Sequence, residues 1–430
     1  MKAIFQKLYG LISKICITIN KIVRKKWFME KIVIYGAGMI GTSERLVNFL
    51  QSTYEIVAYC DSDREKHGKV YHNCEVIDFK EMTDLINKKQ IDMVVMAIAK
   101  QEIVDAVVHE IETKCDLEAV KIIGYKQFLI ENKKKNFPKE NYNKKYIDFS
   151  KNVITWLDNI MSEVDFWINC VAKEDARGRE DYLNRLHNNN FIYEKSLNTD
   201  YLVDYLSVRN TPMVYDIGCG LAPRFGELLP NGNRILLTEV DPLAPFYNTI
   251  NAKFAPCEYS MIKFGMFEYI DMFLQRESAD AIIINNALDH CIDPYKSIVK
   301  CLAVLKKGGL LHLNHGRMEG VVEGYAGLLH QWNLDYDEND NFIIWNNEIM
   351  LNASKRLENI AEINVFHSDE KLPLENQSVW VEMIKKNDFN MDEYLDLSDE
   401  KKDMAQIIEK LMELMAREDT NNVFGKLLNG

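Results

Sequence analysis

The sequence contains no pair of cysteines in Cys-x-x-Cys spacing, and its nine cysteines are scattered along 430 residues. Scattered cysteines are typical of small core residues in a reducing compartment, so we expect a cytoplasmic protein without structural disulfides. There is also no Cys/His set with the spacing of a zinc site and no Asp-Asp-Asn set. The sequence therefore predicts no metal.

Long apolar runs and an excess of positive charge are missing as well. No segment reaches the ~20 apolar residues that a membrane-spanning helix needs. The formal net charge of -13 argues against nucleic acid as the main partner. Hydrophobic residues still make up 47% of the chain, which is enough for a sizeable core, and the length favours two domains.

Residues 1–30 differ from the rest of the chain because no acidic residue precedes Glu30. Apolar residues recur there at helical spacing, with lysines beside them. No small-residue cleavage site follows, so a secretory signal is not expected. A basic amphipathic helix of this kind can lie on the inner face of an anionic membrane, or it can dock on its own protein or on a dimer partner. Both alternatives stay open.

A complete dinucleotide-type glycine pattern follows the expected strand 31–35. Gly36, Gly38 and Gly41 have the G-x-G-x-x-G spacing, and Asp61 lies 20 residues after Gly41, at the end of the next strand. Further strands are expected at 91–97 and 120–124, and helices up to residue 52 and over 103–114. We therefore predict a doubly wound, Rossmann-like α/β domain over residues 31–130.

This segment resembles the nucleotide-binding Rossmann modules found beside sugar-modifying enzymes of bacterial polysaccharide synthesis. The run from Asp61 to Gly68 fits the usual sequence after their second strand. The resemblance implies a nucleotide ligand, for which NAD(P) and a nucleotide-sugar are both open. The alternative is a scaffold in which the glycines only pack a helix on a strand. No Tyr-x-x-x-Lys pair follows, so we do not expect redox catalysis by this half.

Composition divides the remaining chain into four parts. Residues 131–150 are rich in lysine and asparagine and are predicted to be a polar linker. The segment 151–211 is apolar-periodic and predicted to be helical. Residues 212–390 alternate strands with helices, and the runs 342–345, 363–366 and 378–385 are predicted to be late strands of the same sheet. Residues 391–430 are predicted to contain an amphipathic helix.

The most informative stretch runs from Val214 to Gly220. Its apolar residues predict a strand that ends at Asp216. Gly218 and Gly220 then allow the backbone to turn tightly against a ligand. We expect a helix over 225–229 behind this turn. An acid two residues before the first glycine would repel a pyrophosphate but would hold the ammonium of an amino-acid-like cofactor.

Later segments add residues that suit the same ligand. Glu239 and Asp241, at the end of a second strand, lie at the distance from the glycines that suits a ribose diol, and spacing does not choose between them. A strand over 279–284 leads into Asn285-Asn286-Ala287-Leu288-Asp289-His290.

Together these motifs resemble the class I S-adenosylmethionine-dependent methyltransferases, over residues 160–385. The resemblance implies a second doubly wound domain, and a helical cap over the cofactor that includes Glu163 and Trp167. It places adenine beside Met266 and Phe267, and the methionine half of the cofactor beside Asn286 and Ala287. The implied cofactor-binding residues are Asp216, Gly218, Gly220, Glu239, Asp241, Met266, Phe267, Asn286 and Ala287.

Histidine is the side chain best suited to accept a proton from a hydroxyl near neutral pH. We therefore predict His290, directly after the fourth-strand motif, as the base, with a packing role as the alternative. His330 lies in a polar and aromatic run after residue 314 that resembles a bacterial methyltransferase subgroup, and it is predicted to contact the acceptor. His315 is a further candidate.

Three functions are compatible with the sequence. The preferred one is a methyltransferase that acts on a hydroxyl of a small-molecule or glycan acceptor in polysaccharide biosynthesis. The second is a nucleotide-sugar oxidoreductase or epimerase driven by the first domain, for which no proton-transfer pair is found. The third is a non-catalytic cofactor-binding scaffold, although the methyltransferase motifs are intact.

Overall fold

The computed structural model describes residues 29–51, 53–115, 120–136, 140–143, 152–172, 177–187, 200–223, 226–255, 260–325 and 329–417. The chain forms two compact units. The first comprises Met1–Asn136 together with Val321–Gly327, and the second comprises Phe137–Gly320 with Leu328–Gly430. The amphipathic helix expected over residues 1–30 falls almost entirely outside the described residues. No helix in the described ranges is long and apolar enough to cross a membrane.

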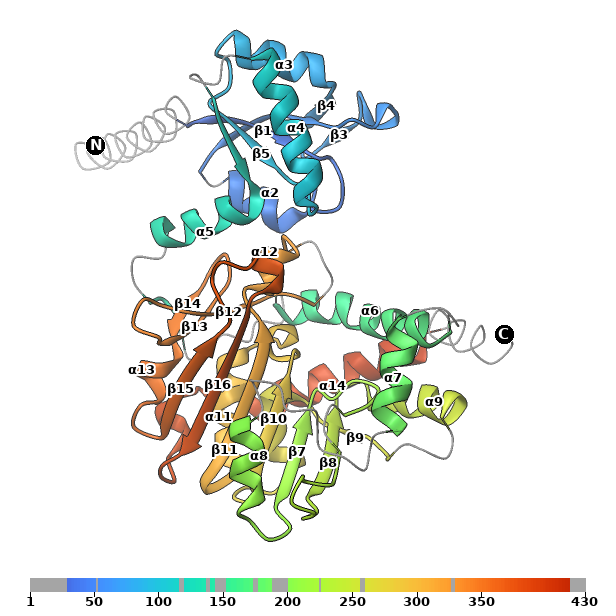
Figure 1. Ribbon diagram of the computed structural model, residues 1–430, viewed down its shortest axis with the longest axis vertical. Coiled ribbons are helices and arrows are strands. Elements are labelled where there is room, and N and C mark those ends of the chain that lie inside the picture. The colour runs from blue at the N-terminus through green and yellow to red at the C-terminus, as the bar shows by residue number, and fades with distance from the viewer. Residues whose placement is uncertain are drawn as a thin grey trace, which may run out of the picture. The chain divides into compact units, whose positions relative to one another are not determined.

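The first unit is built on a six-stranded sheet of order β3-β4-β2-β1-β5-β6. The central strand β1 pairs in parallel with β2 on one side and β5 on the other, so the strand order reverses at β1 (Figure 1). The strands are β1 (Lys31–Tyr35), β2 (Glu55–Cys60), β3 (Val70–Tyr71), β4 (Cys74–Ile77), β5 (Met93–Met96) and β6 (Lys121–Gly124).

The central strands of this sheet are formed by apolar runs of sequence. Four of the five residues of β1 and all of β5 are buried, as expected for parallel strands covered on both faces. The helices of the unit are α2 (Glu44–Gln51), α3 (Phe79–Asn87), α4 (Gln101–Lys114) and α5 (Tyr125–Asn136). Because α5 continues to Asn136, the beginning of the segment predicted as a linker is helical. The doubly wound fold predicted for this part of the chain is confirmed.

The second unit contains a seven-stranded sheet of order β15-β16-β11-β10-β7-β8-β9. The order reverses between β7 and β10, which pair in parallel. Ligands of such sheets bind outside the carboxyl ends of the strands at this point. The strands are β7 (Met213–Ile217), β8 (Leu236–Asp241), β9 (Lys263–Phe264), β10 (Ala279–Asn285), β11 (Leu305–Gly316), β15 (Ala361–His367) and β16 (Ser378–Lys385).

One apolar run forms a strand outside the main sheet. Residues 342–345 form β13 of a separate antiparallel sheet, although the strand pattern alone is equally compatible with the late part of the main sheet. The separate sheet comprises β12 (Asn333–Tyr336), β13 (Phe342–Trp345) and β14 (Met350–Asn352). All four residues of β13 are buried, so its apolar run does not distinguish the two sheets.

Helices accompany the second sheet in the expected order. They include α6 (Asn152–Ala172), α7 (Arg177–His187), α8 (Asp200–Ser207), α9 (Ala244–Phe254), α10 (Ile270–Phe273), α11 (Pro294–Val304), α12 (Glu319–Val322), α13 (Ala353–Leu357) and α14 (Glu400–Ala416). Apolar residues of α6, α9 and α14, such as Ile160, Phe246 and Leu411, share one core cluster. The predicted helical segment before the glycine turn and the predicted C-terminal helix therefore pack together (Figure 1).

The helix expected over 225–229 is not formed. Residues 226–229 are not helical, and Leu228 makes an isolated antiparallel bridge with Arg234. Residue 225 lies outside the described residues. The strand-turn-helix pattern predicts a helix at this point, but Leu229 is instead buried in a cluster with residues of α8, β7 and β10.

Candidate active site

The turn after β7 depends on its glycines. Gly218 and Gly220 have φ of +73° and +66°, in the left-handed region that favours glycine. A Cβ on Gly218 would lie 2.5 Å from Phe267 and 2.6 Å from Ala287, so these two side chains pack closely against the turn and leave no room for a Cβ. The backbone N–H of Gly218 donates to the carbonyl of Val240 in β8. Predicted cofactor residues from three strand ends therefore meet at Gly218.

The two acids at the end of β8 have different partners. Asp241 accepts hydrogen bonds from the backbone N–H groups of Gly220 (3.2 Å) and Leu243 (2.7 Å). Glu239 accepts one from the Ser260 hydroxyl at 2.6 Å. Burial raises the pKa of each carboxyl to about 7, although these hydrogen bonds oppose the shift. Of the two, Asp241 is the acid attached to the glycine turn.

The raised pKa of Asp241 gives a testable pH dependence. Since the folded-state pKa lies above that of an ordinary aspartate, its stabilising contribution is largest at acidic pH and is lost as the pH rises through 7. Asp241→Asn removes the charge, although its amide can accept only one of the two backbone hydrogen bonds. Relative to the wild type, we expect the variant to gain about 2–3 kcal/mol of stability between pH 5 and pH 8.5. Urea unfolding at both pH values, without cofactor, measures this, and an equal stability difference at both would contradict it.

Helix α6 covers the glycine turn, as the resemblance implied for the cap. A Cβ on Gly220 would lie 3.4 Å from the indole ring of Trp167. Glu163, one turn earlier, has a carboxylate oxygen 3.8 Å from Nδ1 of His290, and its charge contributes to the raised pKa of Asp241. Trp156 donates from its indole N–H to the backbone carbonyl of His290 at 3.0 Å. The same helix face thus reaches both the turn and the predicted catalytic residue.

The remaining cofactor candidates differ in exposure and role. Phe267 and Ala287 lie against Gly218, as described above. Met266 is 1% exposed and belongs to the core cluster of α6 and α9. Asn286 has φ +50°, which asparagine tolerates better than most residues, and its side chain accepts a hydrogen bond from Gly316 N–H at 3.1 Å. Asn286 therefore joins the ends of β10 and β11.

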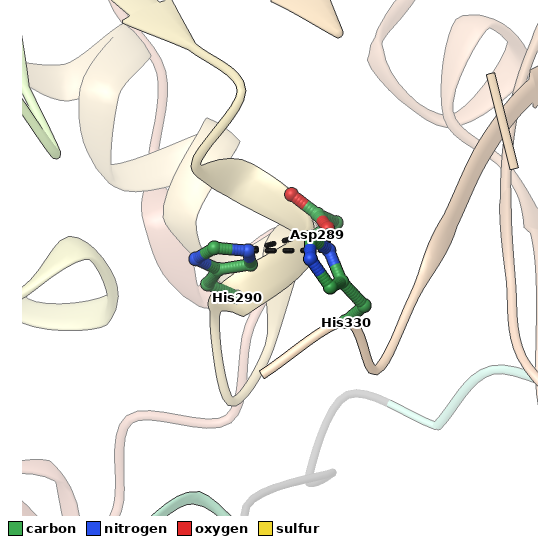
Figure 2. Close-up of side chains that lie close together, drawn as sticks. All are labelled: Asp289, His290 and His330. Atoms are coloured by element: carbon green, nitrogen blue, oxygen red, sulfur yellow. Dashed lines mark hydrogen bonds and ion pairs between the residues drawn. The ribbon is translucent and has the colours of Figure 1, made fainter. Parts of the chain in front are cut away.

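Asp289, His290 and His330 form one cluster, shown in Figure 2. His330 Nδ1 lies 2.6 Å from Asp289 Oδ2 and 3.2 Å from His290 Nε2. His290 Nε2 lies 3.6 Å from the same carboxylate oxygen. Asp289 and His290 come from the 3-10 turn after β10, whereas His330 precedes β12. The structure therefore brings together the two predicted catalytic histidines, which are forty residues apart.

The pKa values of the ionisable residues in and around this cluster depend on one another. Burial disfavours the ionised form of Asp289, but His290 and His330 hold the pKa of its carboxyl well below the usual range. Burial alone would lower the pKa of His330, yet its contacts with Asp289 and Glu319 raise it to about 11. Burial and the charge of Asp289 raise the pKa of Glu319. For His315, burial lowers the pKa to about 4, which makes it neutral at pH 7.

In the first unit, packing explains two of the three pattern glycines. Gly36 has φ +105°, and a Cβ there would lie 2.8 Å from the Ala97 carbonyl oxygen. A Cβ on Gly41 would lie 1.9 Å from the Gly36 carbonyl oxygen. Gly38 does not have a positive φ, and no described atom lies within 4 Å of the position that a Cβ would take there. Among the described residues, neither packing nor conformation therefore requires glycine at position 38.

Asp61 supports the same glycine turn. Its carboxylate accepts hydrogen bonds from the backbone N–H groups of Ala37 (2.8 Å) and Asp63 (2.9 Å) and from the Lys66 ammonium (2.9 Å). Although partial burial acts against the ionised form, these hydrogen bonds lower the pKa of Asp61. The carboxylate is thus ionised at neutral pH and held beside Gly36 and Gly38.

Comparison with known families decides the nature of the second unit. Residues 215–313 match a family described as a methyltransferase domain. The second unit is a class I S-adenosylmethionine-dependent methyltransferase domain. The matched part of this methyltransferase domain contains Asp216, Gly218, Asp241 and His290, whereas Glu319 and His330 lie beyond it. Residues 28–123 match a second family, described as C2185-like, N-terminal.

Solved structures similar to the chain are distant. They include the CurJ carbon methyltransferase, with 16% identity over 56% of this chain and 72% of that chain and a TM-score of 0.33. A possible histamine N-methyltransferase from Thermotoga maritima is 16% identical over 54% of this chain and 99% of that chain, with a TM-score of 0.30. A UDP-D-quinovosamine 4-dehydrogenase from Vibrio fischeri is 24% identical over 22% and 77%, with a TM-score of 0.18. No activity is carried over from these proteins. No curated protein matches the sequence.

Two members of the methyltransferase site are not predicted from the sequence as site residues. Asp289 belongs to the fourth-strand motif and directly precedes His290, and an acid adjacent to a candidate histidine is the local signal that could identify it. Glu319 lies within the polar run after residue 314, and its carboxylate is 3.4 Å from His330 Nδ1. No local pattern distinguishes Glu319 from the other polar residues of that run.

Proposed function

We propose that this methyltransferase transfers a methyl group to a hydroxyl of a sugar or glycan intermediate in polysaccharide biosynthesis. The cluster of Asp289, His290 and His330 carries the hydroxyl part of the proposal. It follows β10 directly, two residues beyond Ala287, whose side chain borders the glycine turn. The sugar part rests on the resemblance of the first unit to modules that accompany sugar-modifying enzymes.

The reaction is an in-line displacement. An acceptor oxygen attacks the methyl carbon, the carbon–sulfur bond breaks with its electron pair on sulfur, and the hydroxyl proton passes to a base. The cofactor supplies the electrophile, so the protein supplies position and removes the proton. His290 is the proposed acceptor of that proton, because the pKa of His330 is raised to about 11 by Asp289 and Glu319 and His330 is therefore already protonated at neutral pH. Cap residues Glu163 and Trp167 would restrict water around the methyl group.

A methyl-transfer assay tests this proposal. Labelled S-adenosylmethionine would be incubated with the full-length protein and a panel of nucleotide-sugars and lipid-linked glycans. We expect label in at least one sugar-containing product, in a linkage that resists mild base as an ether does. Label only in amines or carbon acids would contradict the hydroxyl assignment. Label only in acceptors without a sugar would contradict the polysaccharide assignment.

For the first unit we propose a nucleotide ligand, either NAD(P) or a nucleotide-sugar, at the turn of Gly36, Gly38 and Gly41. The support is Gly38, where the described residues give no internal explanation for glycine. A scaffold would need only Gly36 and Gly41. The oxidoreductase alternative has no added support, since no Tyr-x-x-x-Lys pair follows this turn in the sequence. For residues 1–30 the proposal of a peripheral membrane contact stands beside docking on the protein itself.

A pair of glycine substitutions separates ligand binding from scaffolding. In the full chain, Gly38→Val should leave thermal stability unchanged, because its Cβ meets no described protein atom within 4 Å. It should nevertheless abolish the stabilisation given by whichever dinucleotide or nucleotide-sugar raises the melting temperature of the wild type. Gly41→Ala is the opposite control, because its Cβ would collide with the Gly36 backbone and destabilise the unit. If no nucleotide in the panel stabilises the folded wild type, the scaffold interpretation is favoured.

A further inference from the structure

Four side chains from three separate segments converge beyond β10 and β11. Asp289 and His290 follow β10, Glu319 is the first residue of α12 after β11, and His330 precedes β12. Asp289 Oδ2, His290 Nε2 and His330 Nδ1 form a triangle with sides of 2.6, 3.2 and 3.6 Å (Figure 2). Glu319 Oε2 lies 3.4 Å from His330 Nδ1. Asp289, His290 and His330 thus direct one potential ligand atom each at one small volume, and Glu319 lies beside His330.

The spacing of these atoms suits a bound ion. The point equidistant from the three triangle atoms lies roughly 1.9 Å from each, close to the ~2.0–2.2 Å bonds that zinc makes with histidine nitrogen and carboxylate oxygen. Ligands of a tetrahedral site with such bonds lie about 3.3–3.6 Å apart. The separations of 3.2 and 3.6 Å from His290 are close to this range, whereas the 2.6 Å between Asp289 and His330 is a hydrogen bond that would have to lengthen on metal binding.

The cluster also contains buried negative charge with incomplete hydrogen bonding. Asp289 is 2% exposed, and among the described residues neither its Oδ1 nor Oε2 of Glu319 has a hydrogen-bond partner. His330 contacts both carboxylates, at 2.6 Å from Asp289 and 3.4 Å from Glu319, so either a protonated imidazole or a metal ion at this point would reduce the repulsion between the two carboxylates. Gly316 makes room for one of them, because a Cβ there would lie 2.4 Å from Glu319 Oε1.

We propose that Asp289, His290 and His330 bind one divalent transition-metal ion, with zinc as the best match and a fourth position left for an oxygen ligand from outside the protein. Two imidazoles and one carboxylate suit Zn²⁺ better than Mg²⁺ or Ca²⁺, which prefer oxygen ligands throughout. Glu163, 3.8 Å from the other ring nitrogen of His290, and Trp156, bonded to its carbonyl, hold the orientation of that ligand.

The consequence for catalysis rests on the proposed function. A metal ion in this position lowers the pKa of a hydroxyl that it coordinates. The hydroxyl proton would pass to water, and the resulting alkoxide oxygen would attack the methyl carbon while sulfur retains the electron pair of the broken bond. With the ion bound, His290 would act as a ligand; without the ion, His290 keeps the role of base proposed above, and in either case its loss lowers turnover.

Metal binding can be measured without cofactor or acceptor. The full-length protein would be treated with a chelator, dialysed, and titrated calorimetrically with Zn²⁺, with Mg²⁺ in a separate arm, and bound metal would be counted by elemental analysis. We expect one tightly bound Zn²⁺ per chain and a rise in melting temperature. Asp289→Asn and His330→Gln should each weaken Zn²⁺ binding at least about 100-fold, because loss of even an outer-shell partner of a ligand typically costs ~10–100-fold in metal affinity.

The exposed His109 on α4 provides the matched control, and His109→Ala should bind Zn²⁺ as the wild type does. Melting curves without metal show whether each variant folds, and His290→Gln, at a partly exposed ligand, gives a second variant. Equal Zn²⁺ affinity and stoichiometry in the wild type and in folded His330→Gln or His290→Gln would overturn the site. Tight binding of Mg²⁺ but not Zn²⁺ would overturn the zinc assignment. Neither result affects the methyl-transfer assay, so the two proposals fail separately.

Discussion

His290→Ala should lower the turnover of methyl transfer about 10²–10⁴-fold, the usual contribution of a positioned proton acceptor, while S-adenosylmethionine affinity stays nearly unchanged. The residue lies at the cluster with Asp289 and His330, and the cofactor contacts at Gly218 and Gly220 are made by other residues. An effect confined to the transition state lowers the turnover number and kcat/KM together. Steady-state kinetics with an acceptor found by the labelling assay, and calorimetry of the cofactor, measure the two quantities.

The structure also changes what we expect of the His330→Ala variant. Its position in a loop favours a role in acceptor binding, but it lies 2.6 Å from Asp289 and 3.2 Å from His290. We therefore expect His330→Ala to lower turnover as well, and the double variant to be little worse than either single one, because residues that act as a unit are not additive. Wild-type turnover by folded His290→Ala would make His290 a structural histidine and leave proximity alone to carry the reaction.

Gly218→Val should abolish measurable binding of S-adenosylmethionine, a loss of at least about 100-fold in affinity, or ~3 kcal/mol. The valine Cβ would lie 2.5 Å from Phe267 and 2.6 Å from Ala287, the two residues predicted to border the adenine and the methionine half of the cofactor. Its backbone would also be strained at φ +73°. Displacement of Phe267 and Ala287, or of the turn itself, would remove the surface against which the cofactor would lie.

A matched variant distinguishes the effect of backbone strain on cofactor affinity from the effect of the collision at Gly218. Gly232 has φ +84°, and its Cβ position has no described atom within 4 Å. Gly232→Val therefore carries comparable strain and no collision, so it should lose some stability but bind the cofactor as the wild type does. Cofactor affinity that is unchanged in Gly218→Val, or equally reduced in both variants, would contradict the placement of the cofactor at this turn.

Local patterns are sufficient to predict most of the fold. Buried apolar runs ending in glycines and acids identify β1, β7, β8 and β10 because hydrophobic periodicity and turn chemistry act over a few residues. The same locality explains the errors. The patterns at 226–229 and at 342–345 predict a helix and a strand of the main sheet, and both predictions are wrong because burial does not specify which partner buries a residue.

The site is harder to predict from the sequence than the fold is. Gly218, Phe267 and Ala287 can be grouped only through the resemblance, since they come from three different strand ends. His290 and His330 are each predicted from their residue type, but their contact depends on how the segment after β11 returns to the end of β10. The sequence predicts no metal because it lacks a short metal-ligand spacing, and the proposed site would leave no such spacing because its residues lie forty residues apart.

Calorimetric titration of S-adenosylmethionine, and of its demethylated product, into the full-length wild-type protein tests the central claim most directly. The methyltransferase assignment predicts one site per chain with micromolar affinity, about -8 kcal/mol. Competition between the two ligands should show that they share this site. A folded protein that gives no binding to either ligand at millimolar concentration would contradict the account.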